Sequence, residues 1–112
     1  MWVWKCLTPH PPIIVPEVGK GRESVSQKTV DAMNTLSLKL SNHEPDMLFL
    51  LTPHHHYQRG LHIVIGEQYN GNLAMFGAPE VEISLEGSPE AGERLERHLT
   101  KYLPIHIERQ EK

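Results

Sequence analysis

The sequence has a single cysteine, Cys6, so it cannot form an intrachain disulfide. It has no apolar run near the roughly 18 residues needed to span a membrane, and it starts without the basic segment and apolar stretch of a signal peptide. It also lacks a block of basic residues, and its net charge of −3 argues against nucleic acid as a partner. These absences predict a cytoplasmic protein with neither nucleic acid nor membrane as partner. Because Cys6 lies in a predicted strand, its thiol is expected to be buried.

Histidine is the one residue type that is unusually frequent, with 8 among 112 residues. The length is close to the commonest domain size of roughly 100–150 residues, so we expect a single domain over residues 1–112. The letters Leu-Thr-Pro-His occur twice, in Leu7–His10 and in Leu51–His54, each time at the end of an apolar run. The two copies therefore suggest two equivalent positions in the fold.

Each apolar run is predicted to be a buried strand, one over Trp2–Leu7 and the other over Met47–Leu51. Residues 24–42 between them carry apolar side chains at helical spacing. Strand, helix and strand make a βαβ unit, whose parallel strands end at the same edge of the sheet. Open α/β sheets bind their ligands at that edge, so we expect His10 and His54 to share one crevice there.

The rest of the chain predicts a hairpin-like segment and a second helix. Alternating or short apolar runs predict further strands over residues 61–65, 73–76 and 81–86 and from residue 105 onward. Asn70-Gly71 is a turn signal, and Ser88 followed by Pro89 is typical of a helix start. That helix is expected to end before Pro104. The predicted fold is α/β, with a mostly parallel or mixed sheet and flanking helices.

Imidazole is a common protein ligand for iron, zinc, nickel and copper. His10 and His54 would supply half of a 2-His-1-carboxylate site, which leaves positions on Fe(II) open for a substrate and O2; Zn2+ or another divalent metal is also compatible. His55, His56 and Glu17, a carboxylate near the site in sequence, are candidates either to orient a ligand or to act as an alternative ligand. The other possibility is that at least one of His55 and His56 faces water. The remaining histidines are predicted to be structural or exposed: His43, His62, His98 and His106.

Three segments resemble the class III extradiol ring-cleavage dioxygenases of the B-subunit type and the related Memo-like proteins. They are Thr8–Gly19, Thr52–His54 and Phe76–Val81, and they follow one another in the family's order. The resemblance implies a domain that binds non-haem Fe(II) and opens catechol rings next to the diol, with His10 and His54 as its histidine ligands. It also implies that the glutamate ligand and the catalytic histidine lie in a C-terminal half that has no counterpart here.

The chain therefore resembles the N-terminal half of such a domain, and His55 stands where the family usually has glycine. We expect it to act on a small aromatic, catechol-type substrate with low activity alone, because its third metal ligand and its catalytic base are unidentified. Two helices cannot cover both faces of a buried sheet, so a homo-oligomer or a separately encoded second half is expected. A non-catalytic, Memo-like scaffold that binds a metal or ligand is the alternative, and a Zn2+-dependent hydrolase is a third possibility.

Overall fold

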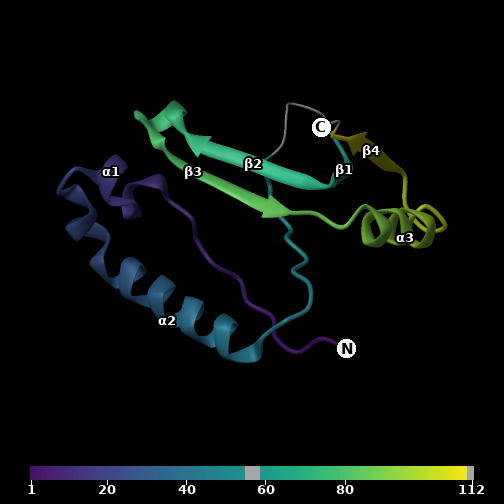
Figure 1. The fold of residues 1–112 in the computed structure, drawn as a ribbon, viewed down its shortest axis with the longest axis horizontal. Helices are drawn as coiled ribbons and strands as arrows, with labels where there is room; N and C mark the ends of the chain where they lie inside the picture. Colours follow the sequence, from purple (N-terminus) through teal and green to yellow (C-terminus); the bar gives the residue numbers. More distant parts are fainter. Residues whose placement is uncertain (55–58, 111–112) are drawn as a thin grey trace. The chain divides into compact units, whose positions relative to one another are not determined.

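The computed structural model describes residues 1–54 and 59–110 of the chain (Figure 1). Its helices and strands, with η for a 3-10 helix, are η1 (Pro12–Ile14), α1 (Pro16–Gly19), η2 (Arg22–Ser26), α2 (Gln27–His43), β1 (Leu61–Ile65), β2 (Gln68–Leu73), η3 (Ala74–Phe76), β3 (Ala78–Glu86), α3 (Pro89–Leu99) and β4 (Ile105–Arg109). The chain forms two compact units, the first from Met1–Leu51 with Asn72–Val81 and the second from Thr52–Gly71 with Glu82–Lys112.

The first unit contains the long helix α2. Its apolar side chains recur at helical spacing and are half-buried: Val30, Met33, Leu36 and Leu40. The helix begins at Gln27 rather than at Ser24, because the preceding residues form the 3-10 turn η2. Within that turn the Ser24 hydroxyl donates a hydrogen bond to the carbonyl oxygen of Gly21 at 3.2 Å. The helix ends at His43, and Glu44 follows in the left-handed conformation with φ of 43°.

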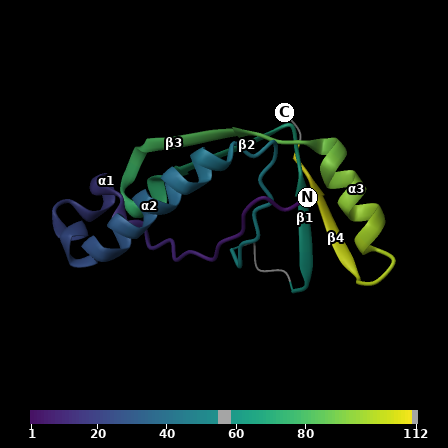
Figure 2. The same ribbon diagram turned by 90° about the horizontal axis from the view of Figure 1, so that it is seen from below.

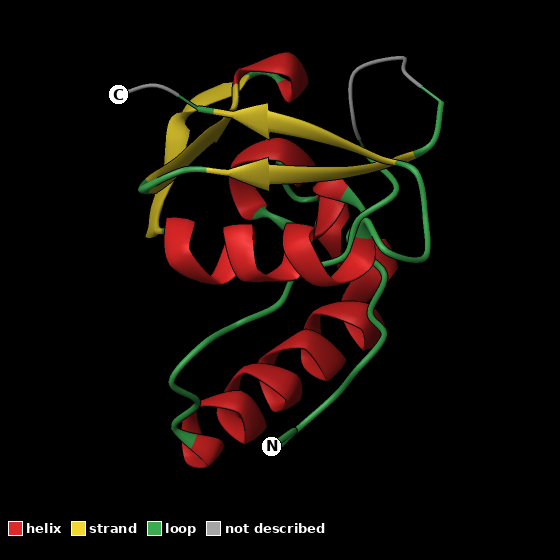
Figure 3. Cartoon of the chain, turned by 90° about the vertical axis from the view of Figure 1, so that its right-hand side faces the viewer, coloured by secondary structure: helices red, strands yellow, loops and turns green. Residues whose placement is uncertain are grey.

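Two segments of the first unit that were predicted as strands, Trp2–Leu7 and Met47–Leu51, are loops (Figure 3). A strand requires a neighbouring chain that accepts and donates its backbone hydrogen bonds, and neither segment has a sheet partner among the described residues. Both expose apolar side chains, with 99% of Leu7 and 83% of Leu50 accessible. The thiol of Cys6 is exposed as well, not buried. The predicted βαβ start is therefore wrong for this chain.

Aromatic contacts nevertheless join these two loops within the first unit. The rings of Trp2 and Phe49 meet edge to face, with centroids 6.4 Å apart. Trp4 stacks on His43, the last residue of α2, at a centroid distance of 6.0 Å. The N-terminal segment is thus attached to the C-terminal end of α2 and to the segment that follows it, although no β-sheet forms between the two loops in the described part of the chain.

The second unit packs α3 against the parallel strands β1 and β4 (Figure 2). Strand β1 has the predicted bounds, and its Leu61 pairs with Ile105 while Ile65 pairs with Arg109. Gly92 of α3 lies against Ile65, so close that an added Cβ would be 2.9 Å from its Cγ1 atom. Ile65 is 4% exposed and belongs to the small core of this unit. The parallel pairing predicted for the two apolar runs occurs here instead.

Helix α3 starts as the sequence predicts. The hydroxyl oxygen of Ser88 accepts a hydrogen bond from the amide of Ala91 at 3.3 Å, and Pro89 is the first helical residue. Such a cap contributes about 1 kcal/mol to stability. The helix ends at Leu99, earlier than expected, and a short turn carries the chain to Pro104 and into β4.

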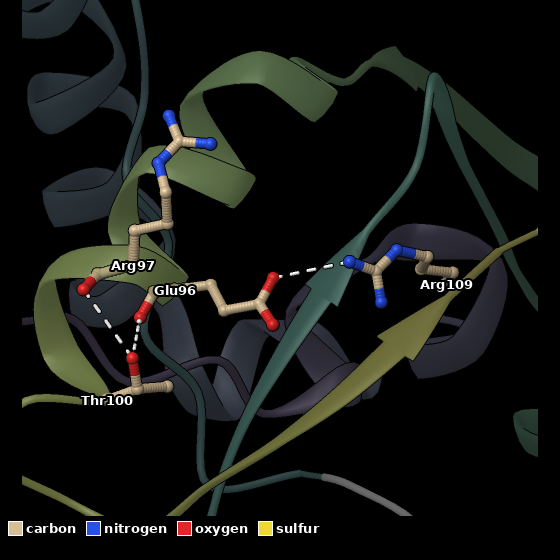
Figure 4. Close-up of polar contacts among 4 residues, drawn as sticks. All are labelled: Glu96, Arg97, Thr100 and Arg109. Atoms are coloured by element: carbon tan, nitrogen blue, oxygen red, sulfur yellow. Dashed lines mark hydrogen bonds and ion pairs between the residues drawn. The ribbon is translucent and has the colours of Figure 1, made fainter.

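Polar contacts tie the C-terminal end of α3 to itself and to β4 (Figure 4). The Thr100 hydroxyl lies 2.9 Å from the carbonyl oxygen of Glu96 and donates a hydrogen bond to it. The guanidinium of Arg109 on β4 is 3.3 Å from the Glu96 carboxylate. More than half of the Arg109 side chain is accessible, so this ion pair contributes at most about 1 kcal/mol. It orients β4 against α3 more than it stabilises the unit.

Strands β2 and β3 form an antiparallel hairpin (Figure 1). The turn predicted at Asn70-Gly71 is wrong, because both residues lie inside β2. The chain reverses instead over residues 73–76, where a short strand was predicted and the 3-10 turn η3 is found. Gly77 closes this turn with φ of 80°, a left-handed conformation that glycine adopts without a steric penalty.

The α/β class and the mixture of parallel and antiparallel pairing are confirmed: residues 1–54 and 59–110 contain one parallel and one antiparallel strand pair, each a two-stranded sheet of its own. In the same part of the chain, none of the helices combines the length and the apolar character required to cross a membrane. The organisation of residues 1–112 as a single domain stays a prediction.

Candidate metal centre

His10 lies in the first unit, between the extended N-terminal segment and η1. Two residues before it, the Thr8 hydroxyl is 2.7 Å from the sulfur of Met33 on α2 and donates a hydrogen bond to it. After it, the amide of Ile14 donates to the carbonyl oxygen of Pro11 at 3.2 Å. The backbone on both sides of His10 is thus held by α2 and by the 3-10 turn, while the imidazole itself is exposed.

His54 lies in the second unit, at the end of the first described range. Its amide donates a hydrogen bond to the hydroxyl oxygen of Thr52 at 3.3 Å, a turn in which a threonine side chain takes the place of a backbone acceptor. The Thr8 hydroxyl instead lies within hydrogen-bonding distance of the Met33 sulfur on α2 and of the Pro9 carbonyl oxygen, which is 3.0 Å away. The two Leu-Thr-Pro-His segments therefore share a sequence but differ in local structure, and the His54 side chain, like that of His10, is exposed.

Of the other predicted site residues, only Glu17 lies in the part of the chain that the structure describes. Glu17 is in the first turn of α1, and its side chain is exposed. His55 and His56 lie outside the described residues. In the part of the chain that the structure describes, no group of three or more histidine, cysteine, aspartate or glutamate side chains could hold a metal ion.

The structure does not bring the two predicted ligands together in one unit. His10 belongs to the first unit and His54 to the second, so their meeting at one crevice stays a prediction. The chemistry of the two side chains can still be compared with the ligand types that the metal requires. Exposed imidazoles are the donor type that iron, zinc and copper accept, so the two side chains fit two of the three protein ligands in a 2-His-1-carboxylate site.

Both Leu-Thr-Pro-His segments fall inside a match to a known protein family. Residues 5–108 match the family of the catalytic LigB subunit of aromatic ring-opening dioxygenase. The chain belongs to the LigB family. This confirms, at the level of the family, the resemblance to B-subunit ring-cleavage dioxygenases predicted from three short segments. The relation to Memo-like proteins stays a prediction.

One relative shows how much of a longer protein this LigB-family chain corresponds to. The chain is 31% identical over 85 residues to Protein CA_C1420 of Clostridium acetobutylicum. That alignment covers 75% of this chain and 18% of the relative. No solved structure matches the chain.

Sequence reasoning did not single out His62 and His106, which the structure places side by side on β1 and β4. Each was predicted to be structural or exposed, because a lone histidine between apolar residues carries no chemical signal. The only available signal was a shared pattern, Leu-His-Ile in β1 and Ile-His-Ile in β4. That pattern places both histidines on one face of a sheet only when the pairing register is known.

Proposed function

We propose that this LigB-family chain carries the metal-binding part of a non-haem Fe(II)-dependent extradiol dioxygenase that opens catechol-type rings. The observation that carries the proposal is the family match over residues 5–108, which includes both His10 and His54. In this proposal the two histidines are two of the metal ligands. The carboxylate ligand and the catalytic base come from outside the described residues, in the same polypeptide or in another.

When bound, ferrous iron supplies open coordination positions at which the two oxygens of a catechol and O2 come together. The chain's own part is to hold two neutral imidazoles in place. For His10, the contact of Thr8 with α2 and the turn at η1 limit the movement of the backbone. For His54, the hydrogen bond from its amide to the Thr52 hydroxyl limits the movement of the backbone between these two residues.

The proposal is tested by Fe(II)-dependent oxygen uptake with catechol under an oxygen electrode. The isolated chain should consume O2 slowly, because a base that removes the second catechol proton is not assigned to any of its residues. Resorcinol, the 1,3-diol, is the matched control, since its two oxygens cannot both reach one metal. Uptake is measured as the excess over the His10→Ala/His54→Ala variant, which corrects for oxidation of free iron and catechol.

An excess with catechol but not with resorcinol would support the ring-opening function. Equal uptake by the chain and the double variant, together with equal metal affinity, would contradict it. Metal binding that depends on both histidines without any oxygen uptake would favour the alternative, a non-catalytic and Memo-like scaffold.

We further propose that the chain works as a homo-oligomer or together with a second chain. The apolar loops of the first unit support this, because side chains that are usually buried are accessible there, with 69% of Trp2 and 75% of Leu51 exposed. Exposed apolar patches commonly mark contacts with other proteins. Unpaired extended segments also offer backbone groups to a strand from another chain.

Light scattering coupled to size exclusion should therefore give a mass above that of the monomer at tens of micromolar. A Leu50→Lys/Leu51→Lys variant should shift the distribution toward monomer, because two charges in an apolar contact are costly to bury. The control is Met75→Lys, an equally apolar and exposed position in η3. A wild-type chain that stays monomeric and melts cooperatively would contradict self-association.

A further inference from the structure

A pair of histidines lies in the second unit, one on strand β1 and the other on strand β4. His62 is directly opposite His106 in the register of the parallel strands β1 and β4. Their imidazole rings are stacked, with centroids 4.8 Å apart and an angle of 21° between the ring planes. Neighbouring strands are about 4.8 Å apart, so the stacking follows directly from the pairing register.

The pair is on the face of the two strands that does not contact α3. Side chains alternate between faces along a strand, and Ile65, three residues after His62, lies against Gly92 of α3. On β4, Arg109 reaches Glu96 of α3 and is three residues after His106. Both histidines therefore point away from the helix.

The same face also carries a carboxylate. Glu108 is two residues after His106 on β4 and pairs with Val64, so it shares the face with both imidazoles. A negative charge on the same face as the two rings favours a cation near them. His106 is exposed and His62 is half-buried, so one ring is anchored by the surrounding chain while the other can turn to meet an ion.

We propose that His62 and His106 form a two-histidine site for a late divalent transition metal, Zn2+ or Cu2+, that bridges β1 and β4. A metal with bonds of about 2.0–2.1 Å to one nitrogen of each imidazole requires these two nitrogens to lie closer together than the 4.8 Å that separates the ring centroids. A tilt of the exposed His106 ring supplies that approach, and water fills the remaining positions. The proposed site uses neither His10 nor His54, and it joins two strands that are far apart in the sequence.

The test separates the two sites by using the His10→Ala/His54→Ala chain as background. Calorimetric titration with Zn2+ should still detect binding in this background. Adding His106→Gln should weaken the affinity about tenfold or more. His98→Gln is the matched control, because it removes an exposed imidazole from α3 in the same unit and should leave the affinity unchanged.

Substoichiometric Cu2+ locates the site in NMR spectra, because this paramagnetic ion broadens the resonances of nearby backbone amides. The resonances of β1 around His62 and of β4 around His106 should broaden first, and His106→Gln should abolish this selectivity. Zn2+ should also raise the melting temperature of the background chain but not that of the His106→Gln chain, because only a bridged pair links the two strands.

His62→Gln should weaken Zn2+ binding as much as His106→Gln does, provided that the second unit stays folded. An NMR amide spectrum of this variant recorded without metal establishes whether it is folded. Zn2+ affinity that is equal in the background and His106→Gln chains, or Cu2+ broadening that begins elsewhere, would overturn the proposal. The stacked rings would then be a packing contact only. Neither result bears on the oxygen uptake assay, so this site can fail while the proposed dioxygenase function stands.

Discussion

Alanine in place of Gly87 is expected to lower the free energy of unfolding by about 2 kcal/mol or more. Gly87 connects the hairpin to the start of α3, and its amide donates a hydrogen bond to the carbonyl oxygen of Glu67 at 2.8 Å. A Cβ at this position would overlap the carbonyl oxygen of Gly66 and would lie 2.7 Å from Cε2 of Tyr69. The Tyr69 ring cannot simply move aside, because its hydroxyl donates to the carbonyl oxygen of Val64 at 2.8 Å.

Urea denaturation followed by circular dichroism measures this loss. The control is Gly71→Ala in β2, where the one described atom within 4 Å of the added Cβ would be Cγ2 of Ile83, at an ordinary 3.9 Å. Glycine inside a strand weakens it, so the control should be neutral or slightly stabilising. If Gly87→Ala and Gly71→Ala unfold at the same urea concentration, the close approach between Gly87 and Gly66 does not govern stability.

Replacing His10 and His54 together by alanine is expected to weaken Fe(II) binding by at least about 10- to 100-fold. That is the loss typical of removing an outer partner of a metal ligand, and removing the ligands themselves should cost no less. Each single variant should lose most of the affinity, because one imidazole alone cannot chelate. Anaerobic calorimetry with Fe(II), repeated with Zn2+ in air, provides the measurement.

The matched control for this prediction is His43→Ala. It removes an exposed imidazole from the first unit, where Nδ1 of the ring donates a hydrogen bond to the Lys39 carbonyl oxygen at 2.6 Å and the ring stacks on Trp4. Zn2+ bound at His62 and His106 would survive in the double variant and appear as a residual second event. Unchanged Fe(II) affinity in the double variant would remove His10 and His54 from the metal centre.

Local sequence signals were sufficient for several elements of the fold. The alternation of apolar residues gives β1 its bounds. The start of α3 is marked by the Ser88 hydroxyl, which caps the helix, and by the ring of Pro89 at the first helical position. The apolar spacing of α2 identifies the helix, although its first turn is a 3-10 turn. In each case the deciding interactions lie within a few residues of one another, so the local sequence contains them.

Pairing between distant segments could not be predicted in the same way. Apolar runs such as Met47–Leu51 indicate that a segment should be covered, but not what covers it. The turn of the hairpin was misplaced for a related reason. Asn70-Gly71 has the stronger local signal, yet Gly77 closes the turn, because the pairing of β2 with β3 decides which glycine needs a left-handed conformation.

The candidate sites show the same difference between what local sequence contains and what depends on the pairing of distant segments. The three segments Thr8–Gly19, Thr52–His54 and Phe76–Val81 were enough to predict the family, because family membership is a property of the sequence. Whether His10 and His54 reach one metal depends on how distant segments meet, which the motif does not contain. The pairing of His62 with His106 became visible only through the register of β1 and β4.

The parallel pair β1 and β4 also has a consequence for the order of folding. Parallel strands need a long crossover, and here the hairpin and α3 both intervene between the two strands. Closing such a loop costs chain entropy before any sheet hydrogen bond is gained. The helices and the hairpin are local and can form early, whereas β4 must wait for α3 before it can meet β1. We therefore expect the pairing of β4 with β1 to be the last step that organises the second unit. Until then, the edge of β1 that will bind β4 has its backbone groups unpaired by that strand.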